Sequence, residues 1–182
     1  DPDSATAYLD LAEVLSAMDQ YDDATAALEQ ALKNEPDNAR AFIDLCDVRD
    51  NLGDFEGAME ALDRGDKISP DMPKISLRRA TLCLHNNRAE EGLGHIDKAL
   101  AAAPKWPALY QVKADMMVTL NRNEEAEEAA RKAIDLNDQL IGSYSILVSL
   151  KKIKTPDDPL FQKMVALAPK SDFGDRSDVP YY

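Results

Sequence analysis

Four prolines recur at a constant interval of 34 residues along this chain: Pro2, Pro36, Pro70 and Pro104. A fixed period of this length indicates a repeat array, in which one small unit of structure stacks on the next. Such arrays present an extended surface to their surroundings and do not close around a single pocket. The period therefore favours a binding scaffold over an enzyme.

Other columns repeat with the same period when the units are counted from Ala5, Ala39, Pro73 and Pro107. In chain order they read Tyr8, Phe42, Ser76, Tyr110 at the fourth position; Ala12, Cys46, Ala80, Ala114 at the eighth; Ala24, Ala58, Gly92, Ala126 at the twentieth; Leu28, Leu62, Ile96, Ala130 at the twenty-fourth; and Ala31, Gly65, Ala99, Ala133 at the twenty-seventh. Small residues between large apolar ones predict two helices in each unit that cross closely.

These columns resemble the tetratricopeptide repeat (TPR) family, whose 34-residue unit has an early aromatic residue, small residues at the eighth and twentieth positions and a closing proline. The resemblance implies an all-α fold, a right-handed superhelix of four full repeats and a shortened fifth helix pair. The expected boundaries are 5–38, 39–72, 73–106, 107–140 and, for the degenerate fifth repeat, 141–169. Residues 1–4 are expected to end a preceding repeat, and residues 170–182 to lead toward a missing downstream segment, which predicts a fragment of a longer protein.

Turn residues divide each repeat into its two helices. Asp19, Gly53, Asn87 and Asn121 share the fifteenth position, and these residue types best tolerate the left-handed conformation that ends a helix. The expected first helices are 5–18, 39–52, 73–86 and 107–120, and the expected second helices are 21–34, 55–68, 89–102 and 123–136. The fifth repeat, whose short second helix is expected to start at Pro159, is expected to close the array and cover the apolar face of the fourth.

Four departures from the family pattern are visible. Ser76 replaces the early aromatic residue, Arg79 and Lys113 stand at the usually apolar seventh position, and Asp138 replaces the closing proline. We expect these departures to weaken the packing of the third and fourth repeats while the register is kept.

Composition and charge narrow the possible partners. Apolar residues make up 45% of the chain and aromatic residues 6%, and the formal net charge is −13. Nucleic acids and anionic membranes require many cationic side chains, so neither is an expected partner. No apolar run approaches the eighteen residues of a membrane-spanning helix.

The residues that most often perform chemistry form no recognisable site in the sequence. Cys46 and Cys83 fall at core positions without a CxxC motif, and two unpaired buried thiols favour a reducing, cytoplasmic location. His85 and His95 are too isolated to indicate a metal site. Because GxxxxGK[ST], HExxH and GxSxG motifs are also absent, we expect no catalytic residue, no cofactor and no enzyme activity.

The TPR resemblance also implies which residues meet a partner, because the second, fifth, sixth, ninth and twelfth positions of the first helices usually line a concave groove. From these positions we predict a partner-binding groove formed by Leu9, Asp10, Glu13, Ile43, Asp44, Asp47, Asp50, Lys74, Leu77, Arg78, Gln111 and Asp115. The implied function is a non-catalytic scaffold that binds a peptide or partner protein there.

The predicted groove is divided by charge. The first two repeats contribute five carboxylates, and the third contributes Lys74 and Arg78. We therefore expect the basic part of a ligand against the first two repeats and an acidic or polar part against the third, with apolar contacts to Leu9, Ile43, Leu77 and Val112. Helix dipoles do not explain why these carboxylates are present, because they lie in the middle of the helices. The alternative to ligand binding is that they simply form a solvent-exposed face.

Two further hypotheses concern the ends of the chain. Leu150-Lys151-Lys152, the 157–159 stretch and Ser177-Asp178 are similar to the link region of bacterial TPR-containing sulfotransferases, which implies the alternative of an accessory region whose catalytic domain lies outside this chain. At the other end, the face of the first helix that includes Tyr8 and Leu11 is expected to be partly uncovered. Such a face predicts weak self-association.

Overall fold

A computed structural model describes residues 4–70, 72–153 and 155–168, and within them it contains ten α-helices and no strand. The sequence-based predictions for Pro2, for the tail 170–182 and for the closing Pro169 lie outside the described residues. The chain divides into two compact units, Asp1–Pro104 and Lys105–Tyr182. No helix in the described part of the chain combines the length and the apolar character that crossing a bilayer requires.

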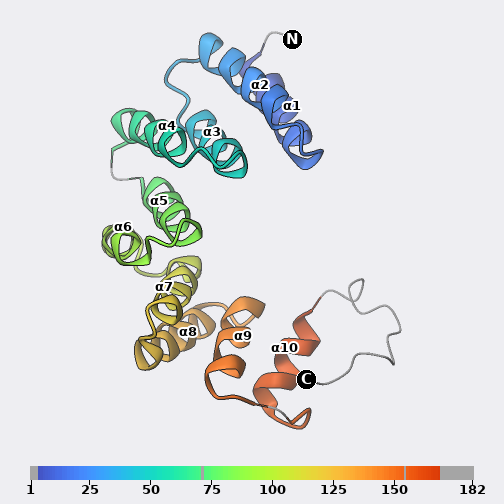
Figure 1. Cartoon of the computed structure of the whole chain (residues 1–182), viewed down its shortest axis with the longest axis vertical. Helices are drawn as coiled ribbons and strands as arrows, with labels where there is room; N and C mark the ends of the chain where they lie inside the picture. The colour runs from blue at the N-terminus through green and yellow to red at the C-terminus, as the bar shows by residue number, and fades with distance from the viewer. Residues whose placement is uncertain (1–3, 71, 154, 169–182) are drawn as a thin grey trace. The chain divides into compact units, whose positions relative to one another are not determined.

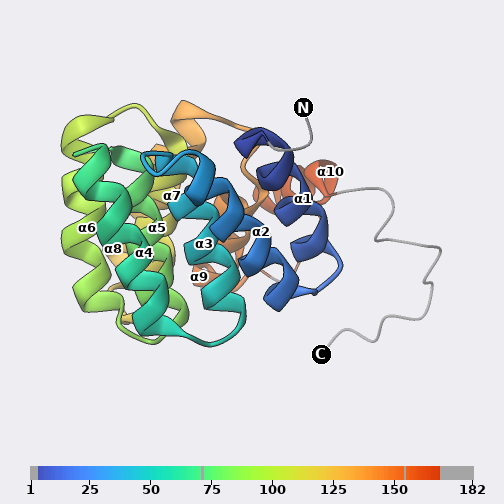
Figure 2. The same cartoon turned by 90° about the horizontal axis from the view of Figure 1, so that it is seen from above.

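The first unit consists of three antiparallel helix pairs (Figure 1). Its helices are α1 (Ala5–Ala17), α2 (Tyr21–Asn34), α3 (Ala39–Asn51), α4 (Phe55–Ile68), α5 (Pro73–His85) and α6 (Ala89–Ala102). Figure 2 shows α1 beside α2 and α3 beside α4. Successive pairs contact one another through α2 and α3 and through α4 and α5, and the first helices α1, α3 and α5 also touch in sequence.

The second unit continues the pairing and then shortens it. It contains α7 (Pro107–Thr119), α8 (Asn123–Leu136), α9 (Ile141–Leu150) and α10 (Pro159–Leu167). Helices α7 and α8 form a pair, α9 packs against both of them, and α10 packs on α9. The all-α architecture expected from the repeat pattern is therefore confirmed.

The turn between the helices of each full pair is made by the predicted residue. Asp19, Asn87 and Asn121 each have φ of 58°, and Gly53 has φ of 75°. Each predicted second helix has the observed bounds, and each first helix ends one residue earlier than predicted. Lys152, with φ of 51°, follows α9 in the same left-handed conformation, which the repeat columns did not indicate.

Side-chain caps start several of these helices. The side chains of Ser4, Asn38 and Asp54 accept hydrogen bonds from the backbone N–H three residues later, at 3.2, 3.1 and 2.9 Å. Asp158 caps α10 by accepting from the N–H of Leu160 at 2.8 Å. Each such cap typically contributes about 1 kcal/mol, because it satisfies an N–H that has no partner inside the helix.

The small-residue columns lie where paired helices cross. Ala24, Ala58 and Ala126 are fully buried, as the twentieth-position column predicted. Gly65 shows why the twenty-seventh column must be small, since a Cβ added there would lie 3.3 Å from both the Phe42 Cβ and the Ile75 Cδ1 atoms. The close approach of backbones therefore depends on side-chain size at these positions.

The shortened fifth pair covers the fourth mainly through its first helix. Ile146 and Leu147 of α9 pack into one core cluster with Ala114 of α7 and Ala130 of α8. Helix α10 has no fully buried residue and adds Leu160 at the edge of this cluster. The expected covering role is thus confirmed for α9, and α10 contributes less because it contacts α9 alone among the helices.

Candidate functional site

The candidate site is a hollow of about 420 Å³ on the first unit, which we call the first-helix hollow. It is lined by Ala12, Glu13, Ser16, Leu28, Arg40, Asp44, Asp47, Val48 and Lys74. All but Leu28 belong to α1, α3 and α5, the three first helices of their repeats. The structure thus brings together Glu13, Asp44, Asp47 and Lys74 of the predicted groove.

One arginine lies between two of the carboxylates of the hollow. Arg40 Nη2 of α3 is 3.5 Å from Glu13 Oε2 of α1, and Arg40 Nε is 3.4 Å from Asp44 Oδ2 one helical turn further along α3. One guanidinium thus serves two carboxylates at long distances, and Lys74 is the second cation that lines this hollow.

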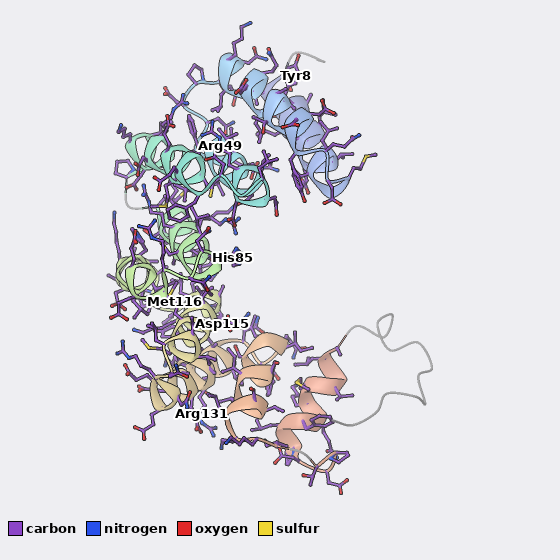
Figure 3. The ribbon with its side chains drawn as sticks, viewed as in Figure 1. Tyr8, Arg49, His85, Asp115, Met116 and Arg131 are labelled. Atoms are coloured by element: carbon purple, nitrogen blue, oxygen red, sulfur yellow. The ribbon has the colours of Figure 1, made fainter. Side chains whose placement is uncertain are left out.

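The next carboxylates are paired more fully with the following repeat. Asp47 of α3 accepts a hydrogen bond from Arg78 Nη2 of α5. Asp50 lies 3.0 Å from Nδ1 of His85, which projects from α5 (Figure 3), and it accepts a 3.4 Å hydrogen bond from Asn86. The sequence predicted separate acidic and basic parts of a groove, whereas the structure joins these residues as cross-links between consecutive first helices.

Electrostatics also distinguish Asp44 from a fully solvated carboxylate. Burial raises the pKa of Asp44, Arg40 and Lys74 oppose that rise, and Glu13 adds to it. The raised pKa means that burial and the neighbouring carboxylate outweigh the two cations. Burial is therefore the main reason that Asp44 differs from a fully solvated carboxylate.

The remaining predicted groove residues of the first unit have different environments. Leu9 and Ile43 are buried in the main core cluster, so they pack helices and offer little surface to a ligand. Leu77 is half-buried, and Asp10 and Lys74 are exposed. The apolar contacts expected of Leu9 and Ile43 are thus made inside the protein.

The two predicted residues of the second unit, Gln111 and Asp115, lie half-buried on α7. The Gln111 side chain lies against α9, since a Cβ added to Gly142 would come within 2.6 Å of its Nε2 atom. Burial alone raises the pKa of Asp115 to about 6. Asp115, labelled in Figure 3, therefore differs from Asp44 and Asp47 of the first unit, which lie beside cations.

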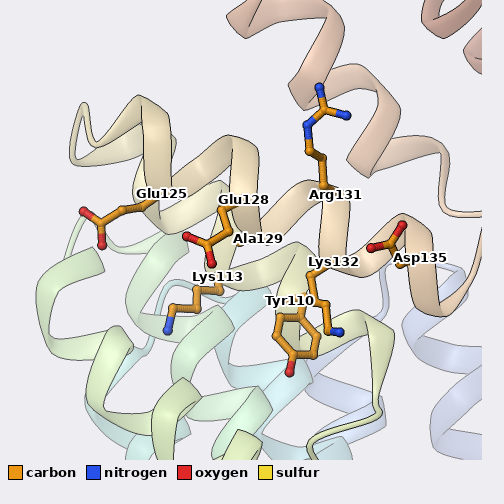
Figure 4. A pocket seen from close by; sticks show the side chains of 8 residues that line it. All are labelled: Tyr110, Lys113, Glu125, Glu128, Ala129, Arg131, Lys132 and Asp135. Atoms are coloured by element: carbon orange, nitrogen blue, oxygen red, sulfur yellow. The ribbon is translucent and has the colours of Figure 1, made fainter.

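The seventh-position cations are accommodated in two ways. Arg79 of α5 is paired with Asp63 of α4 at 2.6 Å, so an ion pair links the third repeat to the second. Lys113 lines a hollow of about 560 Å³ on α7 and α8 (Figure 4). Its other lining residues are Tyr110, Glu125, Glu128, Ala129, Arg131, Lys132 and Asp135. Together with Lys113 the lining has three cationic side chains and three carboxylates, so its charges balance.

One group of possible metal ligands was missed by sequence reasoning. Cys83 of α5 lies with Glu91 and His95 of α6, and a ligand atom from each lies within 4.8 Å of the other two. The sequence places Cys83 on the preceding helix, beyond a turn, so its proximity to Glu91 and His95 was not evident from the sequence. Burial and the nearby Arg79 lower the pKa of His95, although Glu91 opposes them.

Two family models, both described as tetratricopeptide repeat, match the chain. One matches residues 1–42, 17–71 and 51–116, and the other matches residues 107–140. The chain belongs to the tetratricopeptide repeat family. Neither model describes a sulfotransferase region, so that resemblance has no support beyond its short motif. A search of curated protein sequences found no match.

Solved structures of other TPR proteins share the fold at low sequence identity. MamA from Desulfovibrio magneticus RS-1 is 20% identical, with a TM-score of 0.68 over 90% of this chain and 92% of that chain. TTC0263, a thermophilic TPR protein of Thermus thermophilus, is 19% identical, with a TM-score of 0.71 over 90% and 88%. YrrB, a TPR protein with an unusual peptide-binding site, is 12% identical, with a TM-score of 0.59 over 93% and 89%.

Proposed function

We propose that this TPR chain is a non-catalytic protein-interaction scaffold that holds a segment of a partner protein in the first-helix hollow. A basic side chain of that segment binds between Glu13 and Asp44, and an acidic or polar part lies near Lys74. Asp10 and Leu77 extend the contact surface beside the hollow.

The observation that carries the proposal is the single guanidinium between two carboxylates. Arg40 lies 3.5 Å from Glu13 and 3.4 Å from Asp44, and its own side chain is largely exposed. Exposed ion pairs of this kind contribute only about 0–1 kcal/mol, so a ligand cation can displace or join Arg40 at little cost. Lys74 at the edge of the same hollow sets the orientation of a ligand that carries both charges.

Two further features support an interaction role. The family builds an extended surface from stacked helix pairs, which suits the binding of a protein segment. The neighbour YrrB has a peptide-binding site according to its description, and it has the same fold. By analogy with it, a peptide is the ligand class to test first.

The proposal can be tested with labelled peptides and a matched pair of charge variants. A library of basic, acidic and mixed peptides is titrated against the wild-type chain and against Glu13→Gln/Asp44→Asn by fluorescence anisotropy. We expect basic or mixed peptides to bind, and the double variant to weaken them by about fivefold, which corresponds to roughly 1 kcal/mol for two exposed charges. Raising the salt concentration should weaken wild-type binding, because exposed charges are screened within roughly 8–10 Å.

The control is Glu29→Gln/Asp37→Asn, which removes two exposed carboxylates of the same unit away from the hollow. It changes the net charge by the same amount and should leave peptide affinity unchanged. Equal weakening by both variants would show a non-specific charge effect. A preference for acidic peptides would place binding at Lys74 and Arg78 and contradict the proposed orientation.

A second interaction is favoured by the exposed apolar side of α1. Leu11 is 47% exposed, Val14 is exposed on the same helix, and Met18 is exposed directly after the helix ends. We infer that this surface supports weak self-association of the chain, because contiguous exposed apolar side chains tend to be covered in solution. We also infer a cytoplasmic location from the free, buried thiols of Cys46 and Cys83.

A further inference from the structure

Cys83, Glu91 and His95 place three different metal-binding atoms together at the contact between α5 and α6, with Cys83 buried and Glu91 exposed. A sulfur, a carboxylate oxygen and an imidazole nitrogen all lie within 4.8 Å of one another. Within the described residues, no other group of three His, Cys, Asp or Glu side chains comes this close. The cluster lies outside the first-helix hollow and plays no part in the proposed peptide binding.

The repeat pattern does not explain this combination. The three residues occupy the eleventh, nineteenth and twenty-third positions of the third repeat. The same positions hold Leu15, Asp23 and Ala27 in the first repeat, Arg49, Gly57 and Ala61 in the second, and Met117, Glu125 and Ala129 in the fourth. Alanine therefore satisfies the packing at the twenty-third position in every other full repeat, and His95 is an addition specific to the third.

We propose that Cys83, Glu91 and His95 form a Zn²⁺ site with a fourth position open to water. Thiolate, imidazole and carboxylate are the usual zinc ligands, and three protein ligands with one open position are a common arrangement. Magnesium and calcium prefer oxygen ligands throughout, so the thiol and imidazole select against them. When the ion binds, the Cys83 S–H bond breaks, its proton passes to solvent, and the sulfur lone pair forms the S–Zn bond.

The geometry needs little rearrangement. Ligand atoms around a tetrahedral Zn²⁺ lie roughly 3.5 Å apart, so donors at the 4.8 Å limit need to approach by only about 1 Å. Glu91 and His95 are four residues apart on α6 and therefore share one face of that helix. Cys83 on the partner helix is fully buried and has a fixed position opposite them.

Neighbouring contacts orient Glu91. Arg88 donates from Nε and Nη2 to the same Glu91 oxygen, Oε2, at 2.8 and 2.7 Å. The other oxygen takes no part in these two bonds and can turn toward an ion. Arg88 is itself held by the Phe55 ring, whose centroid lies 4.5 Å from the guanidinium carbon. Outer contacts of this kind commonly tune metal affinity by about 10–100-fold.

Charge and access also fit a divalent cation. A thiolate and a carboxylate supply two negative charges, of which the Glu91 carboxylate is shared between the ion and Arg88 at 2.7 Å. The nearby Arg79 is paired with Asp63 at 2.6 Å, which offsets its repulsion of the ion. The Glu91 side chain is 43% exposed, so the ion can enter from the solvent side of α6 while Cys83 closes the inner side.

The chain contains two cysteines and two histidines, so it provides its own matched controls. The 182-residue protein is kept reduced with a phosphine, stripped of metal, and titrated with Zn²⁺ in competition with a chromogenic chelator. The wild type should bind one ion per chain. His95→Ala restores the alanine of the other repeats. This variant and Cys83→Ser should each weaken Zn²⁺ binding by at least about tenfold, because removing a ligand lowers metal affinity at least as much as removing a residue that only orients a ligand.

Cys46→Ala and His85→Gln are the controls. Cys46→Ala also restores the alanine of its column, and neither residue belongs to the cluster. Both variants should bind Zn²⁺ as the wild type does. Zn²⁺ should raise the melting temperature of the wild type and of both controls but not of His95→Ala, because only a specific site stabilises the folded state in this way.

Substitution with Co²⁺ tests the sulfur ligand directly. A thiolate-to-cobalt charge-transfer band should appear in the wild type and in Cys46→Ala and should be missing from Cys83→Ser. Circular dichroism of each variant establishes that it is folded. Equal Zn²⁺ affinity in the wild type and His95→Ala would overturn the proposal. So would binding of Zn²⁺ that millimolar Ca²⁺ displaces, since that result assigns the ion to surface carboxylates.

Discussion

Asp47 and Asp115 occupy the same ninth position of their repeats, one in each compact unit, but their surroundings differ. Asp47 of α3 is paired with Arg78 of the following first helix, α5. Asp115 of α7 is half-buried, and burial alone raises its pKa to about 6. The same residue at the same position is a cross-link in the first unit and an isolated acid in the second.

The two aspartates differ in their surroundings because the sixth position of the following repeat holds a different residue in each unit. Arg78 stands at the sixth position of the third repeat, and the corresponding residue of the fifth repeat is Ile146, which lies in the core cluster of α7, α8 and α9. An apolar residue there packs α9 firmly and supplies no positive charge. The first unit therefore joins its first helices partly by ion pairs, whereas the second joins them by apolar packing.

The largest expected effect comes from a larger side chain at a helix crossing. It tests whether the two units pack their helix pairs in the same way, although they join their first helices differently. Ala58→Leu in the first unit and Ala126→Leu in the second should each lower the free energy of unfolding by about 1–3 kcal/mol, because both alanines are fully buried where helices cross. Ala26→Leu, on the exposed side of α2, should change it by less than about 0.5 kcal/mol. Thermal melting followed by circular dichroism measures all three, and an unchanged Ala58→Leu would contradict the assigned crossing column.

The second prediction breaks the cross-link itself. Arg78→Met should lower the free energy of unfolding by about 1–2 kcal/mol, less than for a fully buried pair because the Arg78 and Asp47 side chains are 27% and 42% exposed. A double-mutant cycle with Asp47→Asn, measured by urea denaturation, isolates the pair. If the two single changes add without coupling, the pair is not a cross-link in solution.

The third prediction concerns the isolated acid. The pKa of Asp115 is raised from 3.8 to about 6 in the folded protein, so the folded state holds the proton more tightly than the unfolded state. Its contribution to stability is therefore present below about pH 4 and is lost as the pH rises through about 6. Asp115→Asn should raise the stability at pH 7 by about 1 kcal/mol, after allowance for partial exposure, with no gain near pH 4.

Asp47→Asn is the matched comparison for that test. Because it removes the partner of Arg78, it should destabilise the chain at pH 7 where Asp115→Asn stabilises it. Urea denaturation at pH 4 and pH 7 gives both signs. Stabilisation of similar size by both substitutions would mean that the two aspartates do not differ as described.

The smallest expected effect concerns the seventh position at the start of the chain. Leu45 of α3 is 2% exposed, whereas Leu11 of α1 at the same position is 47% exposed. Sedimentation velocity should therefore show weak, concentration-dependent self-association that Leu11→Gln/Val14→Gln abolishes. A strict monomer at high concentration would show that exposure of Leu11 recruits no second copy.

Much of the fold could be predicted because its signals are local. Asn87 and Asn121 adopt the left-handed turn, and Ala58 and Ala126 are buried at crossings, as their columns indicated. These properties depend on backbone preference and side-chain size, and the 34-residue period repeats both in each unit. The left-handed Lys152 was missed because the shortened fifth repeat no longer follows the register.

The candidate site was only partly predictable. Glu13, Asp44 and Lys74 do meet at one hollow, as positions on first helices suggested. Leu9 and Ile43 are instead core residues, because the fifth position of these helices faces the packed interior. Asp47 at the ninth position of one repeat pairs with Arg78 at the sixth position of the next. The sequence does contain this signal, because the two opposite charges are 31 residues apart and a search for charge pairs between repeats would find them.

The sequence by itself determined the helix pairs, their turns, their small crossing residues and the family, since each depends on residues that recur at a fixed interval. Only the tertiary structure decided which charges meet and which side chains share a site. Asp47 with Arg78, and Cys83 with Glu91 and His95, come from different helices. Their proximity depends on how helices pack, because Coulomb attraction and metal coordination act over a few ångströms in space, and sequence separation does not report that distance.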